Sequence, residues 1–225
     1  MRSKNNPSGQ KDRSDRSFIE KARRAQIIDA AIHTIAEVGF AKASLARIAA
    51  RAGVSKGVIS YHFAGKDELV EQVVMQVYTD IADSVLPRLL EQPSATAVLR
   101  THILTVAEYM RDHRAHLAAL GEVFTNFRTA DGTLRYGITA NEELYASLEN
   151  LYREGQRTGE FRSFDPRVMA ITQQAAVDSM FAYWTAHPDH DLRAHARELA
   201  DLFERAVRVP TPPLTSADPP TKGAP

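Results

Sequence analysis

The chain has 225 residues, 44% hydrophobic and 25% charged, so it is long enough for one large or two modest hydrophobic cores. It contains no cysteine, which excludes disulfides and thiolate catalysis, and no run approaches the ~18 to 20 uninterrupted apolar residues of a membrane helix. The net charge of zero hides a basic segment up to Lys66 and an acidic remainder, which favours a polyanion partner for the first part alone.

Residues 1–17 have almost no apolar side chains and mix Lys, Arg, Ser, Asn, Gly and Pro. Such a segment cannot bury enough surface to offset the entropy of ordering, so we expect a disordered basic arm. Two roles stay open for it: an arm that touches the DNA backbone or minor groove, or a solvated tail. Because the segment lacks the apolar core of a signal sequence, we expect a cytoplasmic location.

The first predicted helix spans residues 18–38. Its apolar residues, from Ile27 to Ile35, recur at three- and four-residue spacing, which is typical of an amphipathic helix, and Gly39 ends it. We interpret this helix as the scaffold on which the following segment packs.

The stretch 44–63, SLARIAARAGVSKGVISYHF, predicts two short helices separated by a tight turn. Ser44 and Ser55 are placed to cap the two helices with their hydroxyls. Gly53 lies at the turn, where we expect a positive φ that glycine adopts without strain. This is a helix-turn-helix, which holds its second helix, about residues 56–63, so that the amino end can enter a DNA major groove.

The second helix of this motif divides into groove-facing and flanking side chains. We expect Lys56, Gly57 and Ser60 to approach base edges, and Tyr61 and His62 to contact phosphates. The expected DNA-binding residues are Ser44, Arg47, Ser55, Lys56, Gly57, Ser60, Tyr61, His62 and Lys66.

A long connecting helix is predicted over residues 66–90, with Pro87 expected to kink or end it. Glycine, proline and capping residues mark the breaks between the helices that follow, and no strand pattern is present. Residues 209–225 are rich in proline and predict a disordered tail. The further predicted helices span residues 95–112, 114–128, 134–157, 166–186 and 192–207.

The run from Ala25 to Val70 contains EVGF at the end of its first helix, then SLARIAARAGVSKGVISYHF, then KDEL, at characteristic mutual distances. Through these motifs the chain resembles the DNA-binding domain of the TetR family of bacterial transcriptional regulators. The resemblance implies an all-α fold, in which a three-helix DNA-binding domain is joined by a connecting helix to a helical ligand-binding and dimerisation domain. It also implies that Lys66 anchors a phosphate.

We therefore divide the chain into four parts. These are a basic arm (1–17), a helix-turn-helix domain (18–65), a helical ligand-binding and dimerisation domain (66–208) and a Pro-rich tail (209–225).

A helix-turn-helix reads one half-site, so useful specificity normally requires a two-fold dimer. In the resembled family the last two long helices pair, and here they carry enough apolar residues to bury more than one face. The alternative is that these residues only close the core of the monomer. The expected interface residues are Met169, Gln173, Val177, Met180, Phe181, Leu199, Leu202 and Phe203.

A ligand pocket is expected among aromatic and polar residues of the middle helices, although an aromatic stripe at helical spacing is often plain core. An inward-facing Glu108 or Glu122 would favour a cationic or hydrogen-bonding ligand over a fatty acyl chain. The candidate pocket residues are Glu108, Tyr109, Met110, Glu122, Phe124, Phe127, Tyr145, Gln174, Asp178 and Trp184.

No motif indicates catalysis: a glycine-rich phosphate loop, a nucleophile elbow and a zinc-protease helix are all missing from the sequence. The pair His113 and His116 has metal-compatible spacing but lies at a polar helix boundary. We predict no catalytic residue, no cofactor, no metal and no enzymatic activity.

These observations predict a homodimeric transcriptional regulator, in the first place a repressor, that leaves a palindromic DNA operator when an unknown small-molecule effector binds. Its partners would be double-stranded DNA, a second copy of itself and the effector, with no membrane partner. The alternatives are an all-helical carrier or enzyme with an incidental helix-turn-helix, or an activator or nucleoid-type DNA binder of the same family.

Overall fold

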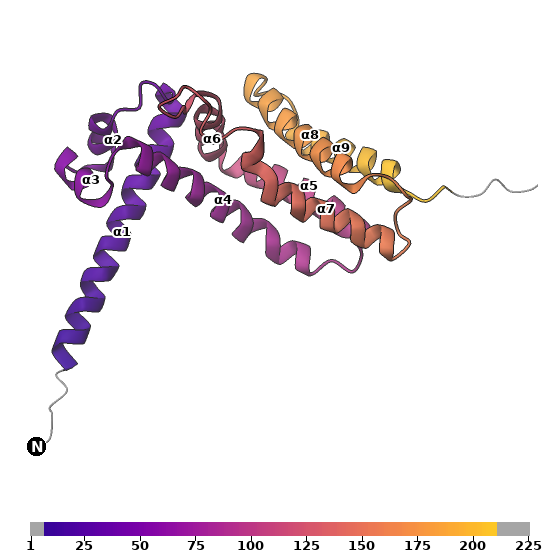
Figure 1. Cartoon of the computed structure of the whole chain (residues 1–225), viewed down its shortest axis with the longest axis horizontal. Coiled ribbons are helices and arrows are strands. Elements are labelled where there is room, and N and C mark those ends of the chain that lie inside the picture. Colours follow the sequence, from indigo (N-terminus) through magenta and orange to yellow (C-terminus); the bar gives the residue numbers. More distant parts are fainter. Residues whose placement is uncertain (1–6, 211–225) are drawn as a thin grey trace, which may run out of the picture.

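The computed structural model describes the backbone of residues 7–210, and side chains from residue 18 onward except 138 and 139. Within that range the chain is helical and has no strand, only two isolated bridges (Figure 1). The elements are α1 (Pro7–Val38), α2 (Leu45–Ala52), α3 (Lys56–His62), α4 (Lys66–Leu90), α5 (Ala95–Asp112), α6 (Arg114–Asn126), the 3-10 helix η1 (Ile138–Asn141), α7 (Glu142–Arg157), α8 (Pro166–Ala186) and α9 (Leu192–Val207).

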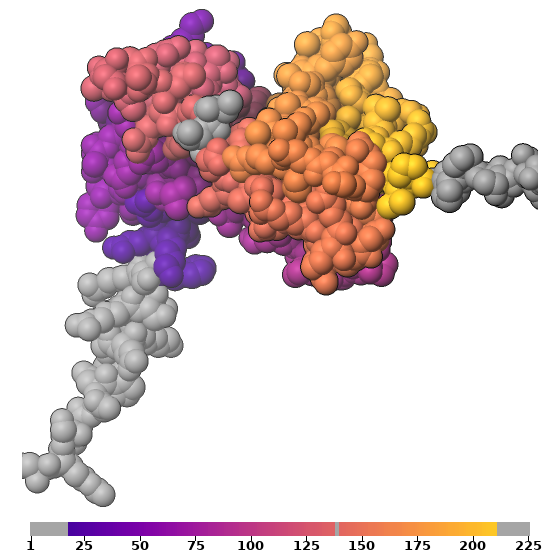
Figure 2. Space-filling model, turned by 45° about the vertical axis from the view of Figure 1, so that its right-hand side comes forward, coloured from indigo at the N-terminus to yellow at the C-terminus, as the bar shows by residue number. Residues whose placement is uncertain are grey.

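Two hydrophobic cores organise these helices. The first joins α1, α2 and α3 to the first half of α4 and to α6, and the second joins α5, α7, α8 and α9. Figure 2 shows the region around α6, in pink, lying directly against the indigo and purple surface of the amino-terminal helices. The predicted boundary between residues 65 and 66 therefore separates helices that share one core.

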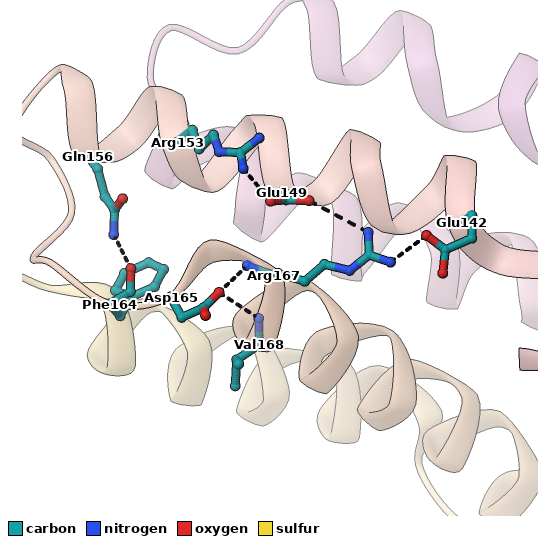
Figure 3. A network of polar contacts seen from close by, with 8 residues as sticks. All are labelled: Glu142, Glu149, Arg153, Gln156, Phe164, Asp165, Arg167 and Val168. Atoms are coloured by element: carbon teal, nitrogen blue, oxygen red, sulfur yellow. Dashed lines mark hydrogen bonds and ion pairs between the residues drawn. The ribbon is translucent and has the colours of Figure 1, made fainter. Parts of the chain in front are cut away.

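Short polar caps explain why the helices of the second core begin where they do. The Asp165 carboxylate accepts from the backbone N–H groups of Arg167, at 2.8 Å, and of Val168, while Pro166 occupies the first turn. The Arg167 guanidinium then lies between Glu142 and Glu149 of α7, 3.6 Å from the Glu149 carboxylate (Figure 3). The start of α8 is thus fixed both by its own cap and by α7.

Two predicted boundaries are wrong. The backbone of residues 7–17 continues α1 instead of forming an arm, and a proline such as Pro7 suits a first helical turn. Residues 1–6 lie outside the described residues.

The predicted helix over residues 134–157 begins only at Glu142. The segment before it forms a turn, in which the Thr129 amide donates to the Thr133 carbonyl, followed by η1. Gly132, at a φ of 85°, permits that turn.

Pro87 does not end α4, which continues to Leu90. The helix runs from the α2 and α3 end of the molecule along the lower edge of the body, beside α5, while α8 and α9 lie side by side on the opposite edge (Figure 1). Of the predicted Pro-rich tail, residues 211–225 lie outside the described residues.

Candidate nucleic-acid interface and internal cavity

The turn between α2 and α3 has the geometry that the sequence predicts. Gly53 adopts φ 64° and ψ 32°, in the left-handed region, and its N–H caps the end of α2. The hydroxyls of Ser44 and Ser55 each accept a hydrogen bond from the backbone N–H three residues on, both at 3.3 Å. The helix-turn-helix is therefore confirmed in the structure.

One face of α3 packs inward and the other faces solvent. Ile59 is fully buried and Phe63 nearly so, both within the first core. Tyr61 has 74% of its surface exposed on the opposite side. Of the predicted DNA-binding residues, the exposed ones are Ser44, Arg47, Ser55, Lys56, Gly57, Ser60 and Tyr61, and the half-buried ones are His62 and Lys66.

Two side chains of α1 hold the helix-turn-helix in place. Arg24 donates to the His62 carbonyl, and its guanidinium lies 4.3 Å from the Phe63 ring centroid. Gln26 donates to the carbonyl of Ala52 at 2.8 Å. Because these bonds meet the carboxyl ends of α2 and α3, they fix the angle at which α3 is presented.

Lys66 contacts the turn between α1 and α2. Its ammonium donates to the Phe40 carbonyl at 2.6 Å and lies 4.3 Å from the centroid of the Phe40 ring. Burial lowers the Lys66 pKa, partly opposed by the negative charge of Asp67. In this structure the side chain therefore connects α4 to the α1–α2 turn, and its predicted contact with a phosphate stays a prediction.

The same turn is held from the other side by α6. Glu122 accepts a hydrogen bond from the Phe40 amide at 2.9 Å, and the Phe40 ring stacks on that of Phe127 at 5.3 Å between centroids. Phe40 is thus bound to α4 through its carbonyl and to α6 through its amide.

A cavity of about 830 Å³ lies between α4, α5, α6, α7 and α8. Its wall is mostly aliphatic, with Phe124 and Phe181 as the larger rings. Its size and its apolar wall are those of a small-molecule site. Four of the predicted pocket residues line it, namely Met110, Phe124, Gln174 and Asp178.

The other six predicted pocket residues do not line this cavity. Glu108 pairs with Arg88 at the surface, at 2.5 Å, and Glu122 is engaged by Phe40. Aromatic residues on helices indicate burial but not which side of a helix they occupy, and here the remaining four pack within the protein. The residues outside the wall are Glu108, Tyr109, Glu122, Phe127, Tyr145 and Trp184.

Polar groups of the wall include several that the sequence did not reveal. The Tyr78 hydroxyl donates to the Asn141 side-chain oxygen at 3.0 Å, and burial, together with the charge of Asp178, raises the pKa of Tyr78 to about 12. The protein around the Asp178 carboxylate withdraws it from water, which raises its pKa, and the hydrogen bond that the Gln174 amide donates to this carboxylate opposes part of the rise. His102 also belongs to the wall. A single histidine on an amphipathic helix carries no sequence signal for such a position.

The predicted dimer residues are mostly internal. Gln173 and Met180 have no exposed surface, and Val177 has 1%, because α8 turns this side toward its own chain. Leu199 and Phe203 are buried as well, whereas Met169 and Phe181 are half-buried and only Leu202 is well exposed, at 57%. The five buried residues close the core of the monomer, which corrects their assignment to an interface. The exposed large apolar side chains of α8 and α9 are Val168, Ile171, Tyr183 and Leu202.

Neither a metal centre nor a membrane span is found in the part of the chain that the structure describes. No group of three or more histidine or carboxylate side chains there is arranged to hold a metal ion. No described helix is long and apolar enough to cross a membrane.

Comparison with known proteins agrees with this arrangement. Residues 27–73 match the family model described as bacterial regulatory proteins, tetR family. The transcriptional regulator BetI 2 of Chromohalobacter salexigens is 45% identical over 191 residues, which cover 82% of this chain and 88% of that protein. The chain belongs to the TetR family.

Other TetR-family relatives match over a shorter part of the chain. BetI 1 of Chromohalobacter salexigens is 49% identical over 70 residues, 31% of this chain, and this match spans only 35% of that relative's length. BetI of Escherichia coli O45:K1 is 43% identical over 82 residues, 36% of this chain and 42% of that protein.

Solved TetR-type structures share the fold across both cores. FadR of Bacillus subtilis, in complex with stearoyl-CoA, superposes with a TM-score of 0.71 at 22% identity, over 82% of this chain and 99% of that one. SmeT, the repressor of the Stenotrophomonas maltophilia multidrug efflux pump SmeDEF, superposes with a TM-score of 0.68 at 20% identity, over 83% and 90%. At these identities the likeness establishes the fold.

This TetR-family chain is a DNA-binding transcriptional regulator, which confirms the prediction of function class. Its relatives are regulators and not enzymes.

Proposed function

We propose that the protein is a repressor that binds a palindromic operator as a homodimer and leaves it when a small molecule occupies the internal cavity. In this proposal residues 18–65 form the DNA-binding unit and residues 66–208 form the ligand-binding and dimerisation unit. Its DNA partner places its activity in the cytoplasm.

The exposed face of α3 would enter the major groove. Lys56 and Ser60 are exposed there, and the half-buried His62 is the last residue of the helix, where it would lie near the DNA backbone. We propose that Lys56, Gly57 and Ser60 approach base edges while Tyr61 and His62 meet phosphates. The flanking caps Ser44 and Ser55, together with Arg47, would position the motif on the DNA backbone.

The proposed release of DNA on ligand binding is supported by one observation: α4 and α6 contribute both to the cavity wall and to the first core, on which the DNA-binding helices pack. Val85 of α4 and Phe124 of α6 line the cavity, while Leu69 of α4 and Val123 of α6 belong to the first core beneath α3. A ligand that displaces these helices therefore acts on the same elements that hold the α1–α2 turn. A change in α4 would alter the spacing of two recognition helices that must match major grooves about 34 Å apart.

The dimer would form through α8 and α9. Ile171 and Leu202 lie exposed on these helices, and solvent-facing apolar groups of this kind gain stability when a second copy covers them. Half-buried Met169 and Phe181 would contribute at the edge of this surface. A two-fold dimer then presents two copies of α3 to a palindromic site.

The named solved structures are consistent with this scheme. SmeT is described as a repressor, and the Bacillus subtilis FadR structure holds stearoyl-CoA. Activation in place of repression would use the same DNA-binding surface and would differ only in where the operator lies.

The test is nuclease footprinting of the purified protein on the DNA upstream of its own coding sequence. We expect one protected, palindromic site for the wild type. Lys56→Ala should lose protection, whereas Arg153→Ala, which removes an exposed cation of α7 (Figure 3), should retain it. No protection at low salt on any such fragment, or equal loss in both variants, would contradict the proposal.

A further inference from the structure

A line of buried polar groups reaches the cavity from the second core. Tyr152, which has no exposed surface, donates its hydroxyl hydrogen to the side-chain oxygen of Gln173. The Gln173 amide nitrogen lies 3.0 Å from Nδ1 of His102. Gln173 is itself fully buried, and His102 is 8% exposed. Three helices, α7, α8 and α5, each supply one member of this line.

Burial settles the protonation state at both ends of the line. It raises the pKa of Tyr152, so the phenol keeps its proton and can donate. It lowers the pKa of His102 to about 4, so near neutral pH the imidazole is uncharged and carries one N–H. The Gln173 amide already gives an N–H to Nδ1, so that nitrogen accepts, and the ring hydrogen must be on Nε2.

The contact with Gln173 fixes the orientation of the His102 ring and so of its Nε2–H group. This group has no hydrogen-bond partner among the described residues. Buried side-chain atoms that lack both a partner and accessible surface occur at Tyr109 and Arg111, and Nε2 of His102 is not one of them. His102 forms part of the cavity wall and keeps 8% of its surface accessible, and Gln173 occupies Nδ1, so Nε2 is the ring nitrogen left to meet a molecule in the cavity.

The rest of the wall limits what can approach this donor. No lysine or arginine belongs to the described lining, and its only carboxylate side chains are those of Glu143 and Asp178. A ligand carboxylate would therefore lose its hydration without gaining a cationic partner. The remaining surface is mainly aliphatic, contributed by residues such as Val85 and Leu148.

We propose that the effector is a mainly apolar molecule that carries no anionic group and has an acceptor oxygen, such as a ketone or ester carbonyl, which accepts a hydrogen bond from Nε2 of His102. Gln173 and Tyr152 are positioning residues that hold the imidazole in the donating tautomer. The inference rests on the proposed function only in taking the cavity as the effector site.

The test compares three probes of nearly equal shape on the full-length protein. The first is methyl heptyl ketone, the second is the alkene in which a CH₂ group replaces its carbonyl oxygen, and the third is nonanoate. Binding is followed through the fluorescence of Trp184, the only tryptophan, whose ring centroid lies 6.1 Å from that of the wall residue Phe181. We expect nonanoate to bind at least about tenfold more weakly than the ketone, since a buried unpaired charge is strongly disfavoured.

Two variants then isolate the hydrogen bond. His102→Leu removes the donor and His102→Gln keeps an N–H group on a side chain of similar reach. The measured quantity is the ratio of the ketone and alkene dissociation constants, which cancels general changes in the cavity. We expect His102→Leu to shift this ratio about fivefold toward the alkene, the worth of one neutral hydrogen bond, and His102→Gln to restore most of the shift.

The outcomes separate this inference from the proposed function. An unchanged ratio in His102→Leu, or nonanoate binding as tightly as the ketone, would overturn the inference. If His102→Leu does not fold, the comparison of nonanoate with the ketone in the wild type still decides. Ketone binding with the expected ratio but without release of operator DNA would support the inference and contradict the release step instead.

Discussion

A line of hydrogen-bonded polar side chains crosses the second core and consists of Tyr152, Gln173 and His102. Burial of these groups both disfavours protonation of His102 and gives its ring a defined hydrogen-bond donor. A neutral histidine with one directed N–H is stable there because Gln173 satisfies the other ring nitrogen. The same burial lowers the pKa of His102, so acid pH destabilises the folded protein at this site. At the scale of single residues, this line gives the cavity wall a specific chemistry.

The stability of the protein should fall at acid pH because of His102. Its pKa is lowered from 6.5 to about 4 in the folded state, so the unfolded chain binds the extra proton first as the pH falls. The contribution of neutral His102 to the free energy of unfolding is fully present above pH 6.5 and is lost between pH 6.5 and 4. By linkage this loss amounts to about 3 kcal/mol. Urea unfolding at pH 7 and pH 4 should show this difference between wild type and His102→Gln. The same pH dependence in both proteins would contradict it.

The role of some residues can be predicted from the sequence, whereas the role of others cannot. Gly53, Ser44 and Ser55 could be assigned because turn and cap chemistry is local. The inward position of Lys66 depends on Phe40, twenty-six residues away, and the position of His102 depends on Gln173 and on the packing of three helices. Only the assembled fold brings such partners together.

At the scale of elements, α6 connects the cavity to the DNA-binding end. Its residues Gly121 and Phe124 face the cavity, while Glu122, between them in sequence, binds the backbone of Phe40. Helical periodicity therefore gives one short helix two working faces. The bounds of most helices follow from their caps and apolar spacing. The helix over residues 7–17 is missed because this segment has no apolar periodicity, whereas residues 134–141 are wrongly joined to α7 because no local signal marks where α7 begins.

The contact between α6 and the α1–α2 turn should be measurable at a single amide. Glu122→Ala removes the acceptor of the Phe40 N–H, so hydrogen exchange at Phe40 should accelerate and the free energy of unfolding should fall by about 1–3 kcal/mol. Glu122→Gln keeps an acceptor oxygen and should lie close to the wild type. Unchanged exchange at the Phe40 amide in Glu122→Ala would show that this bond does not hold the turn.

Two helical glycines should respond in opposite directions to alanine. A Cβ at Gly155 of α7 would lie 2.1 Å from the ring of the buried Phe161, whereas a Cβ at Gly121 of α6 meets nothing within 4 Å. We expect Gly155→Ala to lower the free energy of unfolding by about 1–3 kcal/mol through overpacking. Gly121→Ala should raise it by up to about 1 kcal/mol through helix propensity. Thermal or urea unfolding measures both, and equal effects would contradict the packing described around α7.

At the scale of the whole molecule, the two cores meet along α4 and α6, so DNA reading and cavity occupancy are not mechanically independent. The all-α class and the family could be predicted from the sequence, because the helix-turn-helix motif is contiguous. Which apolar residues of α8 and α9 are buried in the monomer could not, since the buried position of Met180 and the exposed position of Leu202 depend on the rotation of each helix.

Disruption of the exposed apolar face should dissolve the proposed dimer. Leu202→Glu introduces a charge on α9 at a side chain that is 57% exposed, so the monomer should remain folded and light scattering should report half the mass. Leu90→Glu changes an even more exposed leucine at the end of α4, 86% accessible, and should leave the dimer intact. A dimeric Leu202→Glu protein would place the interface elsewhere.

The central claim, that the cavity controls the DNA-binding surface, is tested most directly by reciprocal titration. A ligand found by its thermal stabilisation of the protein is titrated with and without operator DNA, and the DNA is titrated with and without the ligand. We expect each to weaken the other by the same factor, about 5- to 150-fold, because linkage is reciprocal. A ligand that quenches Trp184, so that it reaches the cavity region, yet leaves operator affinity unchanged would contradict the account.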